Sequence, residues 1–152
     1  MKRKEKYGII KHVMDNILAV DYGKKRWGLA FCDELRVVFT LPAATQDDFK
    51  DRVAYLLRVM KERRITQVVM GLPLTLKGDR TAWTEEVEKF AREFIEPTGV
   101  KVDWVDEAMS SVEAAAKQPR RKIKQGRAPR DGTLDSAAAA IILEEWLGAA
   151  LG

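Results

Sequence analysis

The stretch ILAVDYGKKRWGLAFC, residues 17–32, decides how this chain folds. It opens with a short apolar run that ends at an aspartate, Asp21, and it closes with a second run of strand-forming residues at 27–32. Only a short basic turn containing Gly23 separates the two runs. So short a connection favours an antiparallel hairpin, with Asp21 at the end of its first strand.

Downstream of this hairpin, strand-like and helix-like patterns alternate. The expected elements are a third strand at residues 35–39, a helix at 48–63, a strand at 67–72, a helix from Trp83 to Phe94 capped by Thr81, a strand at 101–105, a short helix opened by Ser110 and Glu113, and a last helix opened by Asp135. Breaks are expected at Pro42, Gly71 and Pro73, and the last helix is expected to bury Ala138, Ile141, Ile142 and Trp146.

This order predicts an α/β fold with a mixed sheet of about five strands, an antiparallel meander extended by parallel strands and flanked by helices. That is the ribonuclease H-like arrangement. The glycine motifs of a Rossmann domain and of a P-loop are both absent from the sequence. We expect a basic tail at residues 1–16 and a single domain over residues 17–152.

The composition excludes several catalytic mechanisms and argues against a membrane-spanning or secreted protein. Cys32 is the single cysteine and His12 the single histidine, which excludes a disulfide and a multi-histidine or multi-cysteine metal site and argues against a serine or cysteine triad. No apolar run approaches the roughly 20 residues that span a membrane, and the start of the chain lacks the apolar stretch of a secretory signal. We therefore expect a cytoplasmic protein that does not associate with a membrane.

Carboxylates stand at the ends of three expected elements. Asp21 follows the first strand, Asp106 and Glu107 follow the fifth, and Asp135 opens the last helix. If these ends meet at one edge of the sheet, a divalent cation such as Mg²⁺ is needed to offset their repulsion. A pair of such ions activates a water and stabilises the leaving oxygen in phosphodiester hydrolysis. Adjacent residues of a strand point to opposite faces, so only one of Asp106 and Glu107 can join the cluster.

Each carboxylate also has an ordinary structural explanation. Asp135 is a natural cap for the alanine-rich helix that follows it, and Asp21 is suited to a turn. Asp131 competes with Asp135 for the third position, although the neighbouring Gly132 argues against an ordered helix there.

Four blocks of the sequence, in order, resemble the YqgF/RuvX family, whose members are described as Holliday junction resolvases and as nucleases of pre-16S ribosomal RNA. The blocks are residues 17–30, the Gly-Leu-Pro block at residues 68–74 with Gly78, the block at residues 105–114, and the helix start at residues 135–139. The resemblance implies an RNase H-like fold and a metal-dependent site on Asp21, Glu107 and Asp135, holding Mg²⁺ or Mn²⁺, and it favours Glu107 over Asp106. Ala108 stands where the family usually has arginine, and Lys24 where it has threonine.

Positive charge is concentrated in one segment. The chain has a net charge of +4, but six basic and no acidic residues lie between 119 and 130, and without them the remainder would stand at −2. Basic residues without an acidic partner are suited to nucleic-acid phosphates. The candidates are Arg120, Arg121, Lys122 and Lys124 in this segment, and Lys25 and Arg26, which match a Lys-Arg pair of the family. Tyr22, beside Asp21, is the aromatic residue best placed to stack on a base.

The sequence therefore predicts an Mg²⁺- or Mn²⁺-dependent nuclease of structured RNA, a hydrolase that matures the 5′ end of pre-16S rRNA in ribosome biogenesis. Its partners would be the RNA, with or without ribosomal particles, or branched DNA. One alternative is a Holliday junction resolvase, which two-fold symmetry would require to be a homodimer rather than a monomer. Another is a nucleic-acid-binding protein without catalysis, which the missing arginine at Ala108 suggests.

Overall fold

The computed structural model describes residues 15–109 and 136–151. In chain order the elements are strands β1 (Ile17–Tyr22), β2 (Trp27–Cys32) and β3 (Phe39–Ala44), helix α3 (Phe49–Glu62), strand β4 (Gln67–Thr75), helix α4 (Ala82–Phe90), a π-helical turn (Ala91–Ile95), a 3₁₀ turn (Glu96–Thr98), strand β5 (Lys101–Met109) and helix α6 (Ala137–Leu151). The expected helix after Ser110 lies outside the described residues. No helix within residues 15–109 or 136–151 is long and apolar enough to cross a membrane.

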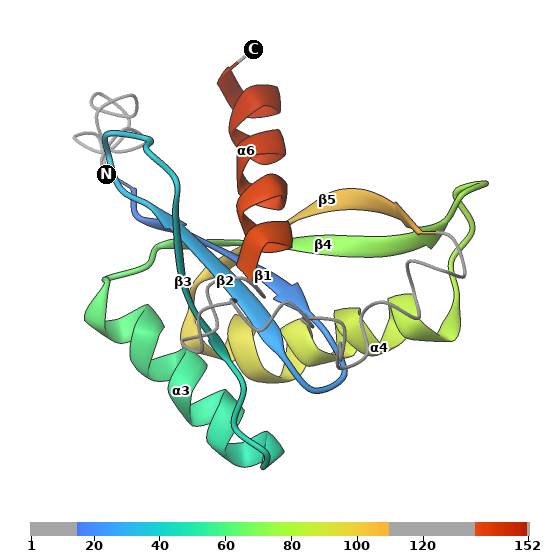
Figure 1. Ribbon diagram of the computed structural model, residues 1–152, viewed down its shortest axis with the longest axis horizontal. Coiled ribbons are helices and arrows are strands. Elements are labelled where there is room, and N and C mark those ends of the chain that lie inside the picture. The colour runs from blue at the N-terminus through green and yellow to red at the C-terminus, as the bar shows by residue number, and fades with distance from the viewer. Residues whose placement is uncertain (1–14, 110–135, 152) are drawn as a thin grey trace, which may run out of the picture.

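The five strands form one mixed sheet in the order β3-β2-β1-β4-β5. The pairs β1–β2 and β2–β3 are antiparallel, whereas β1–β4 and β4–β5 are parallel. Helices α3 and α4 cover one face of the sheet and α6 covers the other (Figure 1). The predicted fold class, a meander extended by parallel strands and flanked by helices, is confirmed.

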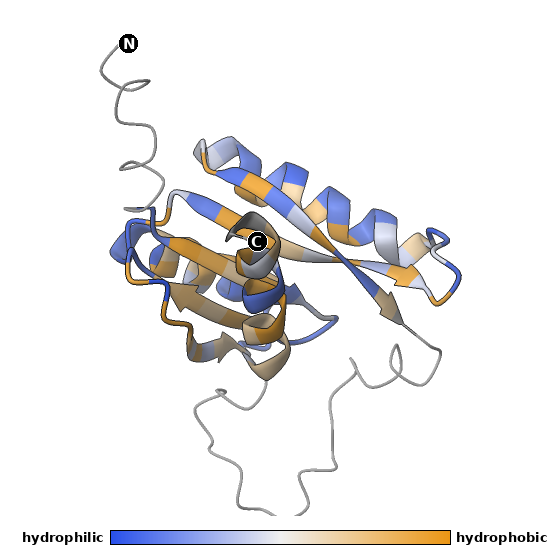
Figure 2. Cartoon of the chain, turned by 90° about the horizontal axis from the view of Figure 1, so that it is seen from above, coloured by the Kyte–Doolittle hydropathy of each residue, from blue (hydrophilic) through white to orange (hydrophobic). Residues whose placement is uncertain are grey.

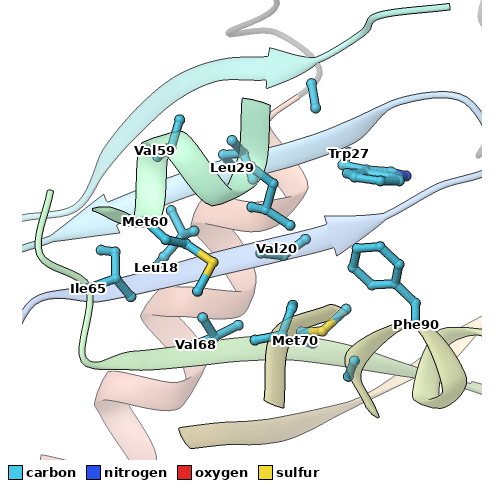
Figure 3. Packing of buried hydrophobic residues seen from close by; sticks show 14 of the residues in the cluster. Leu18, Val20, Trp27, Leu29, Val59, Met60, Ile65, Val68, Met70 and Phe90 are labelled. Atoms are coloured by element: carbon cyan, nitrogen blue, oxygen red, sulfur yellow. The ribbon is translucent and has the colours of Figure 1, made fainter. Parts of the chain in front are cut away.

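Alternation along β1 divides the core into two layers. Leu18 and Val20 are fully buried against α3 and α4, together with Trp27 and Phe90 (Figure 3). Ile17 and Ala19 are buried in the second cluster, against α6. Because successive residues of a strand face opposite sides, the odd-numbered residues of β1 lie on the α6 face. This parity decides which face carries Asp21.

The third strand lies further along the chain than expected. Residues 33–36 form a turn, closed by a 2.9 Å hydrogen bond from the Arg36 amide to the Asp33 carbonyl, and β3 begins only at Phe39. The expected strand at residues 35–39 and the expected break at Pro42 are both wrong. Because β3 is an edge strand, the missing amide of Pro42 costs less there than it would in a central strand.

Strands β4 and β5 are longer than the sequence suggested. β4 continues through Gly71 and Pro73, where breaks were expected, and β5 continues to Met109. The β1–β4 pairing ends at Val20–Met70, so from Gly71 onward β4 pairs only with β5. A proline is tolerated in such a one-sided stretch. Glu107 consequently lies inside β5 rather than after it.

The helices follow their expected positions more closely. Thr81 caps α4, as predicted, and the structure adds a capping box with Thr84. Helix α6 buries Ala139, Ile142, Leu143 and Leu147, whereas Ile141 is 57% exposed, so the expected stripe is only partly correct. Figure 2 shows hydrophilic and hydrophobic residues alternating along α4, whereas the sequence of α6, AAAAIILEEWLGAAL, is mostly apolar. Periodicity cannot select one face of a helix that is apolar nearly all round.

Candidate active site

Asp21 lies near the end of β1, opposite Gly28 of β2. By the alternation of the strand it shares the α6 face with Ile17 and Ala19, and its residue is only partly buried. The next strand on the other side is β4, where Met70 pairs with Val20. Gly71 follows this last pair on β4 as Asp21 follows it on β1.

Glu107 reaches the same place from β5. It pairs with Pro73, and its carboxylate lies over Gly71: a Cβ atom built on Gly71 would be 2.7 Å from Oε1 of Glu107. The same Cβ would be 2.9 Å from Cδ1 of Ile142 in α6, so the carboxylate lies on the α6 face. Asp21 and Glu107 are thus brought to one face, at the carboxyl ends of two strands that flank β4. The neighbouring Asp106 is exposed and alternates to the other face.

The start of α6 is attached to β2 and β3, on the other side of β1 from β4 and β5. Ser136 is fully buried, and its hydroxyl donates to the Leu41 carbonyl at 2.7 Å and accepts from the Leu29 amide at 2.9 Å. These bonds fall at the register shift between β2 and β3, where the strands do not pair regularly. Leu29 directly follows Gly28, the partner of Asp21. Asp135, which precedes Ser136 in the chain, lies outside the described residues.

The predicted basic residues lie partly within the structure. Lys25 is exposed and Arg26 half-buried in the β1–β2 turn, which is closed by a 3.1 Å hydrogen bond from the Gly23 amide to the Arg26 carbonyl. Lys24 extends to α4, where its Nζ lies 4.3 Å from the centroid of the Trp83 ring. Arg120, Arg121, Lys122 and Lys124 lie outside the described residues.

Tyr22 is half-buried and packs against the core, so it is not an exposed base-stacking residue. Its ring stacks on Trp27 and Trp83, with centroids 5.2 and 5.6 Å away, and contacts Phe90 at 4.3 Å. Burial, and to a lesser degree the nearby Glu86 carboxylate, raises the pKa of Tyr22 to about 12. The expectation that Tyr22 stacks on a nucleic-acid base is therefore wrong. Tyr22 instead fixes the end of β1 against α4.

Two residues that shape this region are not identified by reasoning from side-chain chemistry. Gly71 carries no functional group, yet the absence of its side chain leaves the space that Glu107 occupies. Ser136 reads in the sequence only as part of a helix start. The resemblance of residues 68–74 and 135–139 to family blocks is the one signal that marks both.

The carboxylates of Asp21 and Glu107 have the chemistry that Mg²⁺ and Mn²⁺ require, since these ions prefer oxygen ligands. Within residues 15–109 and 136–151, no group of three carboxylate, histidine or cysteine side chains is arranged to hold a metal ion. The described part of the chain thus offers two carboxylates, from separate strands, on one face of the sheet.

A five-stranded mixed sheet of this order, with helices on both faces, defines an RNase H-like fold, the fold of many nucleases. The structure is similar to that of "T. thermophilus RuvC in complex with Holliday junction substrate", with a TM-score of 0.51 and 20% sequence identity over 91% of this chain and 96% of that one. At this identity the likeness concerns the fold alone.

The chain belongs to the RuvX family, whose model is described as "Holliday junction resolvase" and matches residues 15–149. Two relatives carry the name "Putative pre-16S rRNA nuclease". The one from Opitutus terrae is 38% identical over 131 residues, which cover 86% of this chain and 89% of that protein. The one from Synechocystis is 33% identical over 131 residues, covering 86% and 85%. The predicted family is confirmed, and with it the class of the protein, a nuclease.

Proposed function

We propose that this chain is a metal-dependent nuclease that hydrolyses phosphodiester bonds of structured RNA and matures the 5′ end of pre-16S rRNA. The observation that carries the proposal is the Glu107 carboxylate over Gly71, on the face of the sheet that Asp21 shares and one residue beyond the last β1–β4 pair, Val20–Met70. The names of the relatives support the choice of RNA.

Asp21 and Glu107 would hold the divalent cation, and Asp135 would be the third ligand. Consecutive Cα atoms are about 3.8 Å apart, and Ser136 is bonded to Leu29, beside the partner of Asp21. A carboxylate from Asp135, the residue before Ser136 in the chain, would complete the set of ligands. When bound, Mg²⁺ or Mn²⁺ supplies a Lewis acid that lowers the pKa of a water and offsets charge on the phosphate, and a pair of ions would do so on both sides of the bond.

The basic residues would hold the substrate backbone. Lys25 and Arg26 lie in the turn that directly follows the strand of Asp21. Arg120, Arg121, Lys122 and Lys124 belong to the segment that connects the Glu107 strand to α6. Phosphate contacts of this kind give affinity and orientation but little sequence choice. Recognition of a structured RNA would then depend on its shape rather than on its sequence.

A Holliday junction is the second candidate substrate, which the description of the family favours. A four-way junction offers two symmetric cuts, and a resolvase that makes both needs a two-fold dimer. A monomer that cleaves RNA needs no partner copy. The oligomeric state on the substrate therefore separates the two functions.

The test is a cleavage assay on pre-16S RNA and on a four-way DNA junction, with Mg²⁺, with Mn²⁺ and with EDTA. We expect metal-dependent cleavage of the RNA, and a loss of at least about a hundredfold in Asp21→Asn and Glu107→Gln, because one oxygen ligand is removed from a catalytic metal site. Asp106→Asn is the matched control, since this exposed carboxylate lies next to Glu107 on the opposite face.

The outcomes separate the alternatives. Cleavage of the junction alone, by a dimer, would replace the RNA substrate by branched DNA. RNA binding without cleavage under any metal would indicate a binding protein without catalysis. Full activity in Asp21→Asn would contradict the proposed site itself.

A further inference from the structure

The loop between β4 and α4 presents an apolar side chain at the end of the sheet where the candidate site lies, beyond the carboxyl end of β4. Leu76 is 69% exposed at the tip of this loop, directly before Lys77. An exposed leucine is common on protein surfaces and is not by itself informative. The position and the rigidity of this one are what distinguish it.

The loop is held in one conformation by its own backbone. The Gly78 amide donates to the Thr75 carbonyl at 2.8 Å, and the Thr75 amide donates to the Asp79 carbonyl at 2.9 Å. The Asp79 amide donates to the Thr75 hydroxyl at 2.9 Å. Gly78 has a φ of +87°, which a residue with a side chain rarely adopts. The tip that carries Leu76 is therefore a tight, preformed turn.

The far side of the loop is fixed as well. Arg80 forms a salt bridge with Glu88 of α4, and Thr81 caps that helix. Arg80 is paired with Glu88, whereas Lys77 is exposed and forms none of the salt bridges found among the described residues. A leucine and a lysine are thus presented together on a rigid support.

The start of α4, which follows this loop, contacts the basic β1–β2 turn. Trp83, in the first turn of α4, contacts both Tyr22 and Lys24. Figure 1 shows the β4–α4 loop extending beyond the ends of β4 and β5, at the side of the sheet where these strands end. Leu76 lies three residues beyond Pro73, the partner of Glu107, which corresponds to about 10 Å along an extended strand.

We infer that Leu76 is a wedge that inserts between stacked bases of the nucleic-acid substrate, while Lys77 contacts the adjoining phosphate. Apolar side chains on rigid supports unstack bases in this way. The inference rests on the proposed nuclease function. It adds that the nucleic-acid substrate must have a base step near the cut that can be unstacked. Each strand of a duplex carries one phosphate per about 3.4 Å of helix axis, so about 10 Å along that axis places the unstacked step roughly three nucleotides from the phosphate that is cut.

The test uses the full chain and a synthetic RNA hairpin that carries the mapped cleavage site, with 2-aminopurine placed in turn at each nucleotide near the cut. Ca²⁺ replaces Mg²⁺ so that the RNA stays intact. We expect binding to raise the fluorescence at a step about three nucleotides from the cut, because an unstacked 2-aminopurine is brighter. Leu76→Ala should lose most of this rise and cleave the paired RNA about tenfold more slowly.

Two controls make the result specific. Leu35→Ala is the matched variant: Leu35 is 74% exposed on a turn beside a basic residue, Arg36, but at the opposite end of the sheet. A hairpin with a mismatch at the responsive step is already unstacked, and it should restore the cleavage rate of Leu76→Ala to within about twofold of the wild-type rate.

The possible failures are distinguishable. If the wild-type protein cleaves the RNA but Leu76→Ala behaves like Leu35→Ala, the wedge is wrong and the proposed function stands. If the mismatch does not restore Leu76→Ala, the leucine acts in some way other than unstacking, and the wedge is again wrong. If the wild-type protein neither binds nor cleaves nucleic acid, the proposed function and the wedge fall together.

Discussion

Glu107 occupies the space that a side chain at Gly71 would fill. A Cβ atom at position 71 would lie 2.7 Å from Oε1 of Glu107, closer than non-bonded atoms approach. Gly71 on β4 and Asp21 on the neighbouring strand β1 each directly follow the last pair of these two strands, Val20–Met70. The glycine therefore allows carboxylates from two strands that do not touch each other to share one face of the strand between them.

Replacement of this glycine should damage activity more than stability. In Gly71→Ala the new methyl group displaces the Glu107 carboxylate and the end of Ile142, both of which are flexible. We expect nuclease activity to fall at least tenfold, while overpacking lowers the free energy of unfolding by about 1–2 kcal/mol. Cleavage rates and urea denaturation measure the two effects.

The matched control is Gly148→Ala in α6, where a Cβ atom meets nothing within 4 Å. That change should leave activity intact and add about 1 kcal/mol of helix stability. Equal activity in the two alanine variants would show that the position of Glu107 does not matter.

Removal of the Ser136 hydroxyl should destabilise the attachment of α6. Ser136→Ala leaves the Leu29 amide and the Leu41 carbonyl without this partner in a fully buried place. An unsatisfied buried polar group costs about 1–3 kcal/mol, so we expect a loss of about 3 kcal/mol for the two together. Thr40→Ala, on an exposed position of β3, is the control and should change stability by under about 0.5 kcal/mol. A similar small effect in both variants would contradict the role of Ser136.

Tyr22 should make the stability of the protein sensitive to high pH. Its pKa is raised by burial to about 12 from an ordinary value of 10, so the folded state favours the protonated phenol. The stabilisation is therefore complete below pH 10 and is lost as the pH rises from 10 towards 12. In Tyr22→Phe this loss is absent. Burial also raises the pKa of Tyr55, but Tyr55 is present in both proteins and contributes equally to their dependence on pH.

Urea denaturation at several pH values checks this prediction. The wild-type protein should lose stability relative to Tyr22→Phe above pH 10, and the absorbance difference between the two proteins should titrate near pH 12. A difference titration at pH 10 would place the Tyr22 phenol in water rather than among the aromatic rings.

The basic segment should contribute the salt dependence of nucleic-acid binding. Replacement of Arg120, Arg121 and Lys122 by alanine should lower the slope of log affinity against log salt by up to about 2–3, since each phosphate contact contributes about 0.7–0.9. The control is alanine at Arg58, Lys61 and Arg64, exposed residues of α3 and the turn after it, which removes the same charge elsewhere. Identical slopes for the two triple variants would exclude a specific clamp.

The hairpin of β1 and β2, the helices and the mixed sheet could be predicted from the sequence because each depends on local periodicity. The extents of β3, β4 and β5 could not, because they depend on which neighbours a strand has. Pro42 and Pro73 read as breaks, but one lies on an edge strand and the other where β4 pairs on one side only. Such one-sidedness is a property of the sheet and not of the segment.

The candidate site, too, could be predicted from the sequence only in part. Asp21 and Glu107 stand out in the sequence as carboxylates beside apolar strands, and the structure brings them to one face. The core role of Tyr22 is not evident from the sequence, because its partners Trp27, Trp83 and Phe90 come from two other elements, β2 and α4. Gly71 acts through the absence of an atom, which no pattern of side chains reveals.

The most direct test of the account is a titration of the protein with Mn²⁺, followed by electron paramagnetic resonance of the free ion. The account predicts that Asp21→Asn and Glu107→Gln each weaken Mn²⁺ binding at least about tenfold, since each removes a charged oxygen ligand, while Asp106→Asn binds as the wild-type protein does. Unchanged Mn²⁺ affinity in both Asp21→Asn and Glu107→Gln would contradict it.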